Sequence, residues 1–153
     1  MRGGPGERAL LVAVWVAQLA ILLVVAAHHE PWRDEADVWL FARDAEPSAW
    51  LSFLKHSGTP GLWHLLVTPL ARSGLPYASI NFLNVAIVSI GVAIFLRYAP
   101  LPLFLKLLIP FGVLPLHEYG VVARSYGLSF TLLMATCAVL GARRAPRTPP
   151  SAP

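Results

Sequence analysis

The stretch that decides the fold runs from Ala9 to Ala27 and reads ALLVAVWVAQLAILLVVAA. All nineteen residues except Gln18 are apolar. At about 1.5 Å per residue, a helix of this length nearly spans the hydrocarbon core of a bilayer, which is about 30 Å thick. Arg2 and Arg8 precede the run, as in a signal peptide, but the apolar region of a signal peptide normally covers only about 7–15 residues. We therefore expect an uncleaved first transmembrane helix.

The composition of the whole chain agrees with a membrane protein of one domain. Of its 153 residues, 56% are hydrophobic and 13% are charged, against roughly 45–50% and about 25% in soluble domains. A soluble fold of this length would need more polar surface. The net charge of +4 does not indicate nucleic-acid binding, because the basic residues lie at the ends of apolar runs, as they do beside membrane helices. We expect the lipid bilayer as a partner and no nucleic acid.

Three further apolar segments predict transmembrane helices, and they cover residues 78–96, 101–117 and 126–142. The middle segment contains Pro102, Pro110 and Pro115. Membrane helices tolerate proline where neighbouring groups satisfy the freed carbonyls, so we expect this helix to be kinked. The sequence thus predicts an all-α, polytopic membrane domain over residues 9–142, with about four transmembrane helices.

The polar segments predict how the chain is oriented. Residues 28–77 form a long loop that holds most of the acidic residues. Within it, the segments between Ser48 and Ala71 are too short to span, and their Trp and Leu content suits helices lying in the headgroup plane. Because positively charged segments stay on the cytoplasmic side, we expect residues 1–8 and the disordered, basic, proline-rich tail 143–153 to be cytoplasmic. The loop would then lie outside the plasma (inner) membrane.

The outer loop holds the carboxylates best suited to chemistry. Asp34 and Glu35 follow the first predicted helix closely. A carboxylate near a membrane surface can act as a general base when apolar neighbours raise its pKa. Asp34 could equally cap the helix that follows, with Asp37 near the free N–H groups of its first turn. From these residues alone, both interpretations stay open.

A second group of candidates lies near the outer ends of the last two predicted helices. Arg124 could clamp a phosphate with two parallel hydrogen bonds, or it could pair with Glu118 or with a lipid headgroup. Tyr119 and Tyr126 flank it in the sequence. The amides of Asn81 and Asn84 lie on one face of the second predicted helix, where they would join neighbouring helices or, as an alternative, contact a substrate.

The histidines do not predict a metal site. There are five of them, including His56 in the outer loop, and none shows the spacing typical of zinc ligands. We therefore expect no metal ligands and no cofactor, while the dependence on a divalent cation stays open.

Three motifs carry a resemblance to a known family. They read WRDEADVW from Trp32, HSGTPGLWHLL from His56 and EYGVVARSYGL from Glu118. In this order and spacing, over roughly residues 9–140, the chain resembles the N-terminal part of the C-type membrane glycosyltransferases. The branch related to protein O-mannosyltransferases and aminoarabinose lipid A transferases is the most similar one.

The resemblance implies a function and assigns roles to residues. The donor would be a sugar linked to a polyprenyl phosphate, and the acceptor would lie on the outer face of the membrane. Asp34, with Glu35 beside it, would provide the base, and Arg124 would bind the phosphate with Tyr119 and Tyr126 nearby. His56 and Glu118 are further candidates of the same outer region.

The chain also departs from the family's pattern. Gly61 stands where the family has a second proline, and Trp63 and His64 stand where it has paired tyrosines. Family members usually have many more helices, so we expect this chain to be an N-terminal portion: either a truncated product that is inactive alone, or half of a split enzyme that a second chain completes. The alternative is a membrane scaffold or assembly partner that keeps the helical framework without chemistry.

Overall fold

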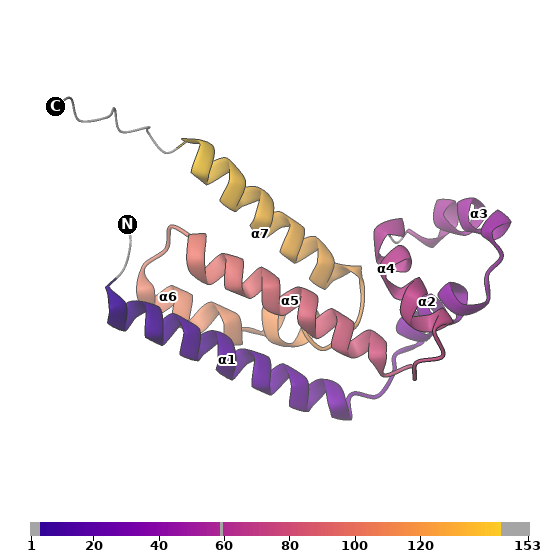
Figure 1. The fold of residues 1–153 in the computed structure, drawn as a ribbon, viewed down its shortest axis with the longest axis horizontal. Helices are drawn as coiled ribbons and strands as arrows, with labels where there is room; N and C mark the ends of the chain where they lie inside the picture. Colours follow the sequence, from indigo (N-terminus) through magenta and orange to yellow (C-terminus); the bar gives the residue numbers. More distant parts are fainter. Residues whose placement is uncertain (1–3, 59, 145–153) are drawn as a thin grey trace.

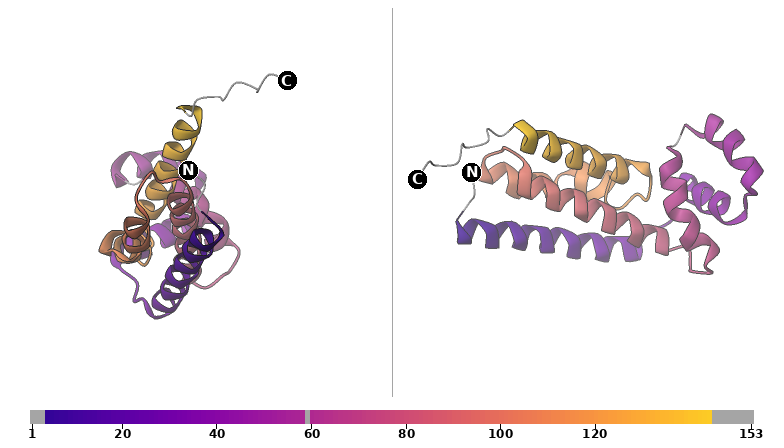
Figure 2. Two further views of the ribbon diagram at one scale, coloured as in Figure 1. Left: turned by 90° about the vertical axis from the view of Figure 1, so that its left-hand side faces the viewer. Right: turned by 45° about the horizontal axis from the view of Figure 1, so that its top comes forward.

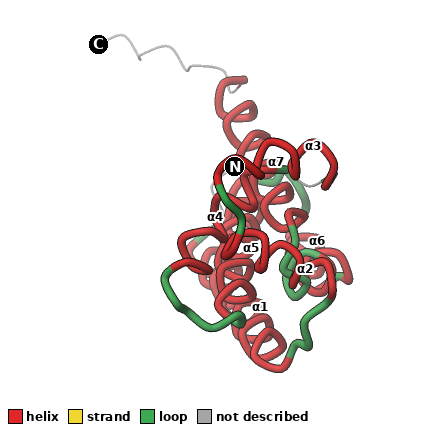
Figure 3. The backbone as a smooth tube through the Cα atoms, turned by 90° about the vertical axis from the view of Figure 1, so that its right-hand side faces the viewer, coloured by secondary structure: helices red, strands yellow, loops and turns green. Residues whose placement is uncertain are grey.

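The computed structural model describes residues 4–58 and 60–144, and within these ranges the chain forms helices and loops but no strand (Figure 3). Three helices are long and apolar enough to cross a membrane: α1 (Pro5–His28), α5 (Ser79–Tyr98) and α7 (Ser125–Arg144). They confirm three of the predicted membrane segments. The predicted tail lies almost wholly outside the described residues.

The three long helices lie side by side and form an elongated bundle (Figures 1 and 2). The central helix is α5, which packs against both α1 and α7. Its buried residues Val85, Val88 and Val92 meet Leu22 and Ala26 of α1. The outer faces of α1 and α7 instead expose large apolar side chains, among them Val12, Val16, Val24, Leu132, Leu133 and Val139. Apolar surface on this scale suits a hydrocarbon environment, because bulk water would oppose its exposure. The chain is therefore a helical membrane protein.

Small residues let α5 and α7 approach closely. A Cβ atom added to Gly127 would lie 2.5 Å from Cγ2 of Val88, and one added to Gly91 would lie 2.5 Å from Oγ1 of Thr131. The hydroxyl of Thr131 also donates a hydrogen bond of 2.8 Å to the carbonyl of Ile87. Close packing through glycine and interhelical hydrogen bonds are the main forces that join helices within a membrane.

The segment between α5 and α7 differs from the prediction. Instead of one kinked helix over residues 101–117, it forms α6 (Leu103–Leu108), a 3₁₀ turn η1 (Ile109–Phe111) and a π turn η2 (Leu114–Glu118). Pro110 and Pro115 cause the breaks, because proline lacks the N–H of a helical hydrogen bond and its ring clashes with the preceding turn. The segment still returns along the bundle from the end of α5 to the start of α7 (Figure 1). The predicted count of four spanning helices is therefore not confirmed.

Asn84 of α5 holds the irregular end of this segment. Its Nδ2 atom donates to the carbonyls of Tyr119, Gly120 and Val122 at 2.8, 3.1 and 3.3 Å. Carbonyls outside regular helix need such donors in an apolar environment. The amide thus joins α5 to a neighbouring segment, as the first of the two interpretations of this residue predicted.

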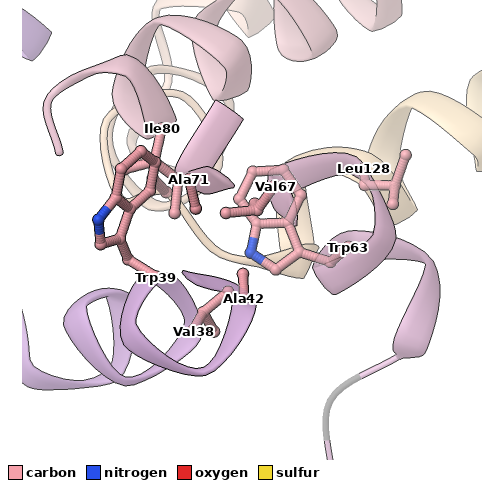
Figure 4. Close-up of a cluster of buried hydrophobic side chains, with 9 residues drawn as sticks. Val38, Trp39, Ala42, Trp63, Val67, Ala71, Ile80 and Leu128 are labelled. Atoms are coloured by element: carbon pink, nitrogen blue, oxygen red, sulfur yellow. The ribbon is translucent and has the colours of Figure 1, made fainter. Parts of the chain in front are cut away.

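Three short helices form a cap at one end of the bundle: α2 (Arg33–Asp44), α3 (Pro47–Ser57) and α4 (Gly61–Arg72) (Figures 1 and 3). The start of α1 and the end of α7 lie at the opposite end (Figure 1). Side chains from α2 and α4 face one another in the core of the cap, which Ile80 and Leu128 extend into the bundle (Figure 4). Arg72 also binds the end of α2, donating to the carbonyls of Ala42 and Ala45 at 3.0 and 2.6 Å.

Candidate functional site

Glu35 joins the cap to the bundle. Its side chain has no exposed surface, and its carboxylate accepts hydrogen bonds from the backbone N–H of Trp32 at 2.7 Å and from Nε2 of His29 at 3.0 Å. It also accepts one from the backbone N–H of Ala123, just before α7. These donors, together with the positive end of the α2 dipole, compensate for burying a carboxylate. The structure thus gives Glu35 a positioning role, and its expected part in catalysis stays a prediction.

Tyr77 lies close enough to the buried Glu35 for the charge of this carboxylate to act on its phenol. Its hydroxyl is buried without a hydrogen-bond partner among the described residues, and its ring meets Trp39 edge-on at 5.6 Å. Burial, and secondarily the negative charge of Glu35, raises the pKa of Tyr77 well above its usual range. The phenol is therefore neutral at physiological pH.

The hydrogen bond between Ala123 and Glu35 holds α2 against the start of α7. This contact brings Asp34 next to Arg124. Oδ2 of Asp34 lies 3.2 Å from Nη1 of Arg124, and the side chains are 54% and 31% exposed. The Arg124 guanidinium also lies over the ring of Tyr126, 4.9 Å from its centroid. Arg124 therefore pairs with Asp34 and not with Glu118, which was one alternative. Because α2 begins at Arg33 with Trp32 as its N-cap, Asp34 lies within the first turn and is not the N-cap, which was one of its two interpretations.

The ion pair lies on the wall of a cleft between the cap and the start of α7. The cleft has a volume of about 410 Å³, which is within the range of about 300–1,000 Å³ common for small-molecule sites. Its lining combines charged, polar and aromatic side chains from α2, α3, α4 and α7: Asp34, Asp37, Val38, Leu40, Phe53, Trp63, His64, Arg124 and Ser125. Such a mixture can bind a ligand that has both charged and apolar parts.

His64 is the most unusual group in this lining. It is fully buried, and neither ring nitrogen makes a hydrogen bond of regular geometry among the described residues, although the backbone of Pro60 lies near enough to act on the ring. The rings of Phe41, Trp50 and Phe53 surround it at centroid distances of 5.7, 6.4 and 5.3 Å. Burial lowers the pKa of His64, and the backbone of Pro60 offsets this only in part. The imidazole is therefore neutral near pH 7.

The remaining candidates lie outside the cleft lining. Tyr119 stacks on Phe130 at 5.7 Å, and Glu118 lies beside His117, with 3.5 Å between carboxylate and ring. The exposed His56 is within 2.8 Å of the carbonyl of Ser52 in its own helix. The structure thus brings Asp34, Arg124 and Tyr126 together and leaves these three elsewhere.

Sequence reasoning missed the positions of His64 and Asp37 in the cleft. The only signal for His64 was its departure from the tyrosine of the motif, because a lone histidine on an apolar helix usually belongs to the core. Within residues 4–58 and 60–144, no group of three histidine, cysteine or acidic side chains is arranged to hold a metal ion.

Comparisons of this chain with protein-family models, with curated proteins and with solved structures find no match. Its class therefore rests on the fold and the cleft: a helical membrane protein with three candidate spanning helices and a helical cap at one end.

Proposed function

We propose that the chain is the N-terminal portion of a membrane glycosyltransferase, which transfers a sugar from a polyprenyl phosphate to an acceptor on the outer face of the membrane. The observation that supports this most is the pairing of Asp34 with Arg124 on the wall of the cleft. A sugar transfer of this kind needs a base for the acceptor and a cation for the departing phosphate. The pair supplies one of each within a single site.

In the proposed reaction, the phosphate of the donor replaces Asp34 as the partner of Arg124. The freed carboxylate of Asp34 takes the proton of the acceptor hydroxyl. The acceptor oxygen then attacks the anomeric carbon from the face opposite the phosphate, and a new C–O bond forms with inversion. The old C–O bond breaks, and its electron pair leaves with the lipid phosphate, whose charge Arg124 balances.

The proposal includes an orientation and a partner. The cap and cleft would face the outside of the plasma (inner) membrane. The opposite end of the bundle, where Arg97 lies in the last turn of α5, would then face the cytoplasm with both termini. This agrees with the tendency of arginine to stay on the cytoplasmic side. A second chain would complete the donor site by supplying further helices, for which the apolar outer faces of α1 and α7 offer contact surfaces.

The alternative is a scaffold or assembly partner without chemistry. The observation that favours it is the same ion pair, because a contact between α2 and the start of α7 also helps to hold the cap in place. Exposed ion pairs add only about 0–1 kcal/mol to the free energy of unfolding. In a purely structural role, the pair would therefore contribute little. A scaffold would not need to bind a lipid phosphate.

Binding of polyprenyl phosphate to the full chain in lipid nanodiscs, together with whatever partner completes the donor site, tests the proposal. Arg124→Gln should weaken binding about 10- to 100-fold, since a hydrogen bond to a charged group contributes roughly 1.5–3 kcal/mol. Arg97→Gln is a matched control, because Arg97 also lies over a neighbouring tyrosine ring, Tyr98, but at the opposite end of the bundle. Equal affinities for both variants, or no binding by the unaltered chain, would favour the scaffold.

A further inference from the structure

Two side chains of the cleft lining contain buried polar atoms that make no hydrogen bond of regular geometry among the described residues. Within the cleft lining these are both ring nitrogens of His64 and the indole nitrogen of Trp63. Both side chains are fully buried. Buried polar groups in proteins are nearly always hydrogen-bonded, and one that is not needs an explanation such as a ligand that supplies the missing partner.

The chemistry of His64 defines the group that would match it. A neutral imidazole has one N–H donor and one nitrogen acceptor, and burial keeps the ring of His64 neutral. A hydroxyl group can also donate and accept, so adjacent hydroxyls of a sugar can satisfy both ring nitrogens. A phosphate offers acceptors only and suits Arg124 better.

The positions of the surrounding side chains fit a sugar as well. Phe53 adds an aromatic surface to the cleft beside His64, and Asp37 adds a carboxylate that can accept hydrogen bonds from further hydroxyls. Arg124 lines the same cleft, so the sugar and the phosphate of one donor would bind within a single site.

We infer that His64 recognises hydroxyl groups of the sugar carried by the lipid donor, and so contributes to the choice of sugar. This inference rests on the proposed function, which it extends from the phosphate to the sugar. His64 would be a specificity residue that contacts the substrate but does not take part in the proton transfer. Its aromatic neighbours hold the ring in place, because they contact it from α2 and α3.

Two probes of equal charge separate the sugar from the phosphate: a polyprenyl-phosphate-linked hexose, and the methyl ester of the same polyprenyl phosphate, which serves as the bare lipid phosphate. We expect the unaltered chain, in nanodiscs with whatever partner completes the donor site, to bind the first probe about tenfold more tightly, as one or two neutral hydrogen bonds would provide. His64→Phe keeps an aromatic ring and should abolish this difference without changing the affinity for the bare lipid phosphate. His56→Phe is the matched control, because His56 is exposed and lies outside the cleft lining, and it should keep the difference.

A second measurement uses the unaltered protein. The ¹⁵N resonances of the His64 ring should shift when the sugar-bearing probe is added and should stay in place with the bare lipid phosphate. A purely structural role of His64 would not produce this response, and the readout decides the question even if the phenylalanine variant does not fold.

The outcomes distinguish the two proposals. If the sugar adds no affinity or leaves the ring resonances unchanged, while the lipid phosphate still binds through Arg124, the inference about His64 is wrong and the proposed function stands. If His64→Phe folds and keeps the full tenfold difference, the inference is also wrong. If the unaltered chain binds neither probe, both proposals fall together.

Discussion

The carboxylate of Glu35 accepts a hydrogen bond from the backbone N–H of Ala123, which joins the first turn of α2 to the residue that precedes Arg124. Because Asp34 and Arg124 are the chain neighbours of these two residues, the buried contact also determines the distance between the members of the exposed ion pair. A structural carboxylate thus lies beside the proposed catalytic one, and the two can be separated by mutation.

Glu35→Ala should destabilise the protein strongly. The substitution leaves the N–H groups of Trp32 and Ala123 without their acceptor, and each unsatisfied buried donor costs about 1–3 kcal/mol. We expect a lower unfolding temperature for the purified chain in detergent. Glu30→Ala is the control, because Glu30 is exposed in the same loop. An unchanged unfolding temperature for Glu35→Ala would contradict the positioning role.

Asp34→Asn should separate catalysis from stability. Asparagine keeps the size of the side chain but removes its basicity, so sugar transfer should fall by about 10²–10⁴-fold while the amount of folded protein stays the same. The assay uses the full chain with whatever partner completes the enzyme. Asp44→Asn is the control, since Asp44 is also paired with an arginine, Arg43, but at the far end of α2. Full activity of Asp34→Asn would end its assignment as the base.

Gly127→Ala should push α5 and α7 apart. The added methyl group would lie within 2.5–2.8 Å of Val88, of the side-chain oxygen of Asn84 and of the carbonyl of Tyr119. Overpacking of this kind typically costs about 1–3 kcal/mol. Gly141→Ala is the matched control on the same helix, because nothing lies within 4 Å of the position of its added Cβ. Equal unfolding temperatures for the two variants would show that the close contact of α5 with α7 is not present in the membrane.

The stability of the cap should depend on the pH through His64. Burial lowers the pKa of His64 in the folded state, so the unfolded chain binds a proton more readily, and stability is lost as the pH falls below the ordinary histidine value of about 6.5. His64→Phe should reduce the loss measured between pH 7 and pH 5 by thermal unfolding, whereas His56→Phe should not. An identical acid profile for His64→Phe and the unaltered chain would show that His64 titrates normally.

The orientation can be tested by labelling single cysteines in intact cells, in a background where Cys137 is replaced by serine. Ser73 lies exposed at the cap, and Pro100 lies exposed after α5 at the other end of the bundle. We expect an impermeant maleimide to label Ser73→Cys but not Pro100→Cys. The reverse pattern would place the cleft in the cytoplasm and would exclude an acceptor on the outer face.

Local properties of the sequence were enough to predict the membrane segments. The run from Ala9 to Ala27 and the two later apolar segments that form α5 and α7 were found because helix length and bilayer thickness are matched, and because hydropathy is a property of each segment alone. The short helices between residues 48 and 71 were predicted for a similar reason. The break between α6 and α7 was underestimated, since the three prolines were expected to bend one helix rather than to divide it.

Only the tertiary structure decided which side chains form the site. From the sequence, Asp34 and Glu35 were equivalent neighbours, and Arg124 had Glu118 as a nearer partner. The fold buries Glu35 under backbone N–H groups and exposes Asp34 to Arg124, because adjacent residues on a helix point in different directions. It also places His64 in the cleft lining, where its ring makes no hydrogen bond of regular geometry to the part of the chain that the structure describes. Sequence patterns identify which segments can enter a membrane, but contacts between segments far apart in the chain decide which side chains meet, since such contacts depend on how all the helices pack together.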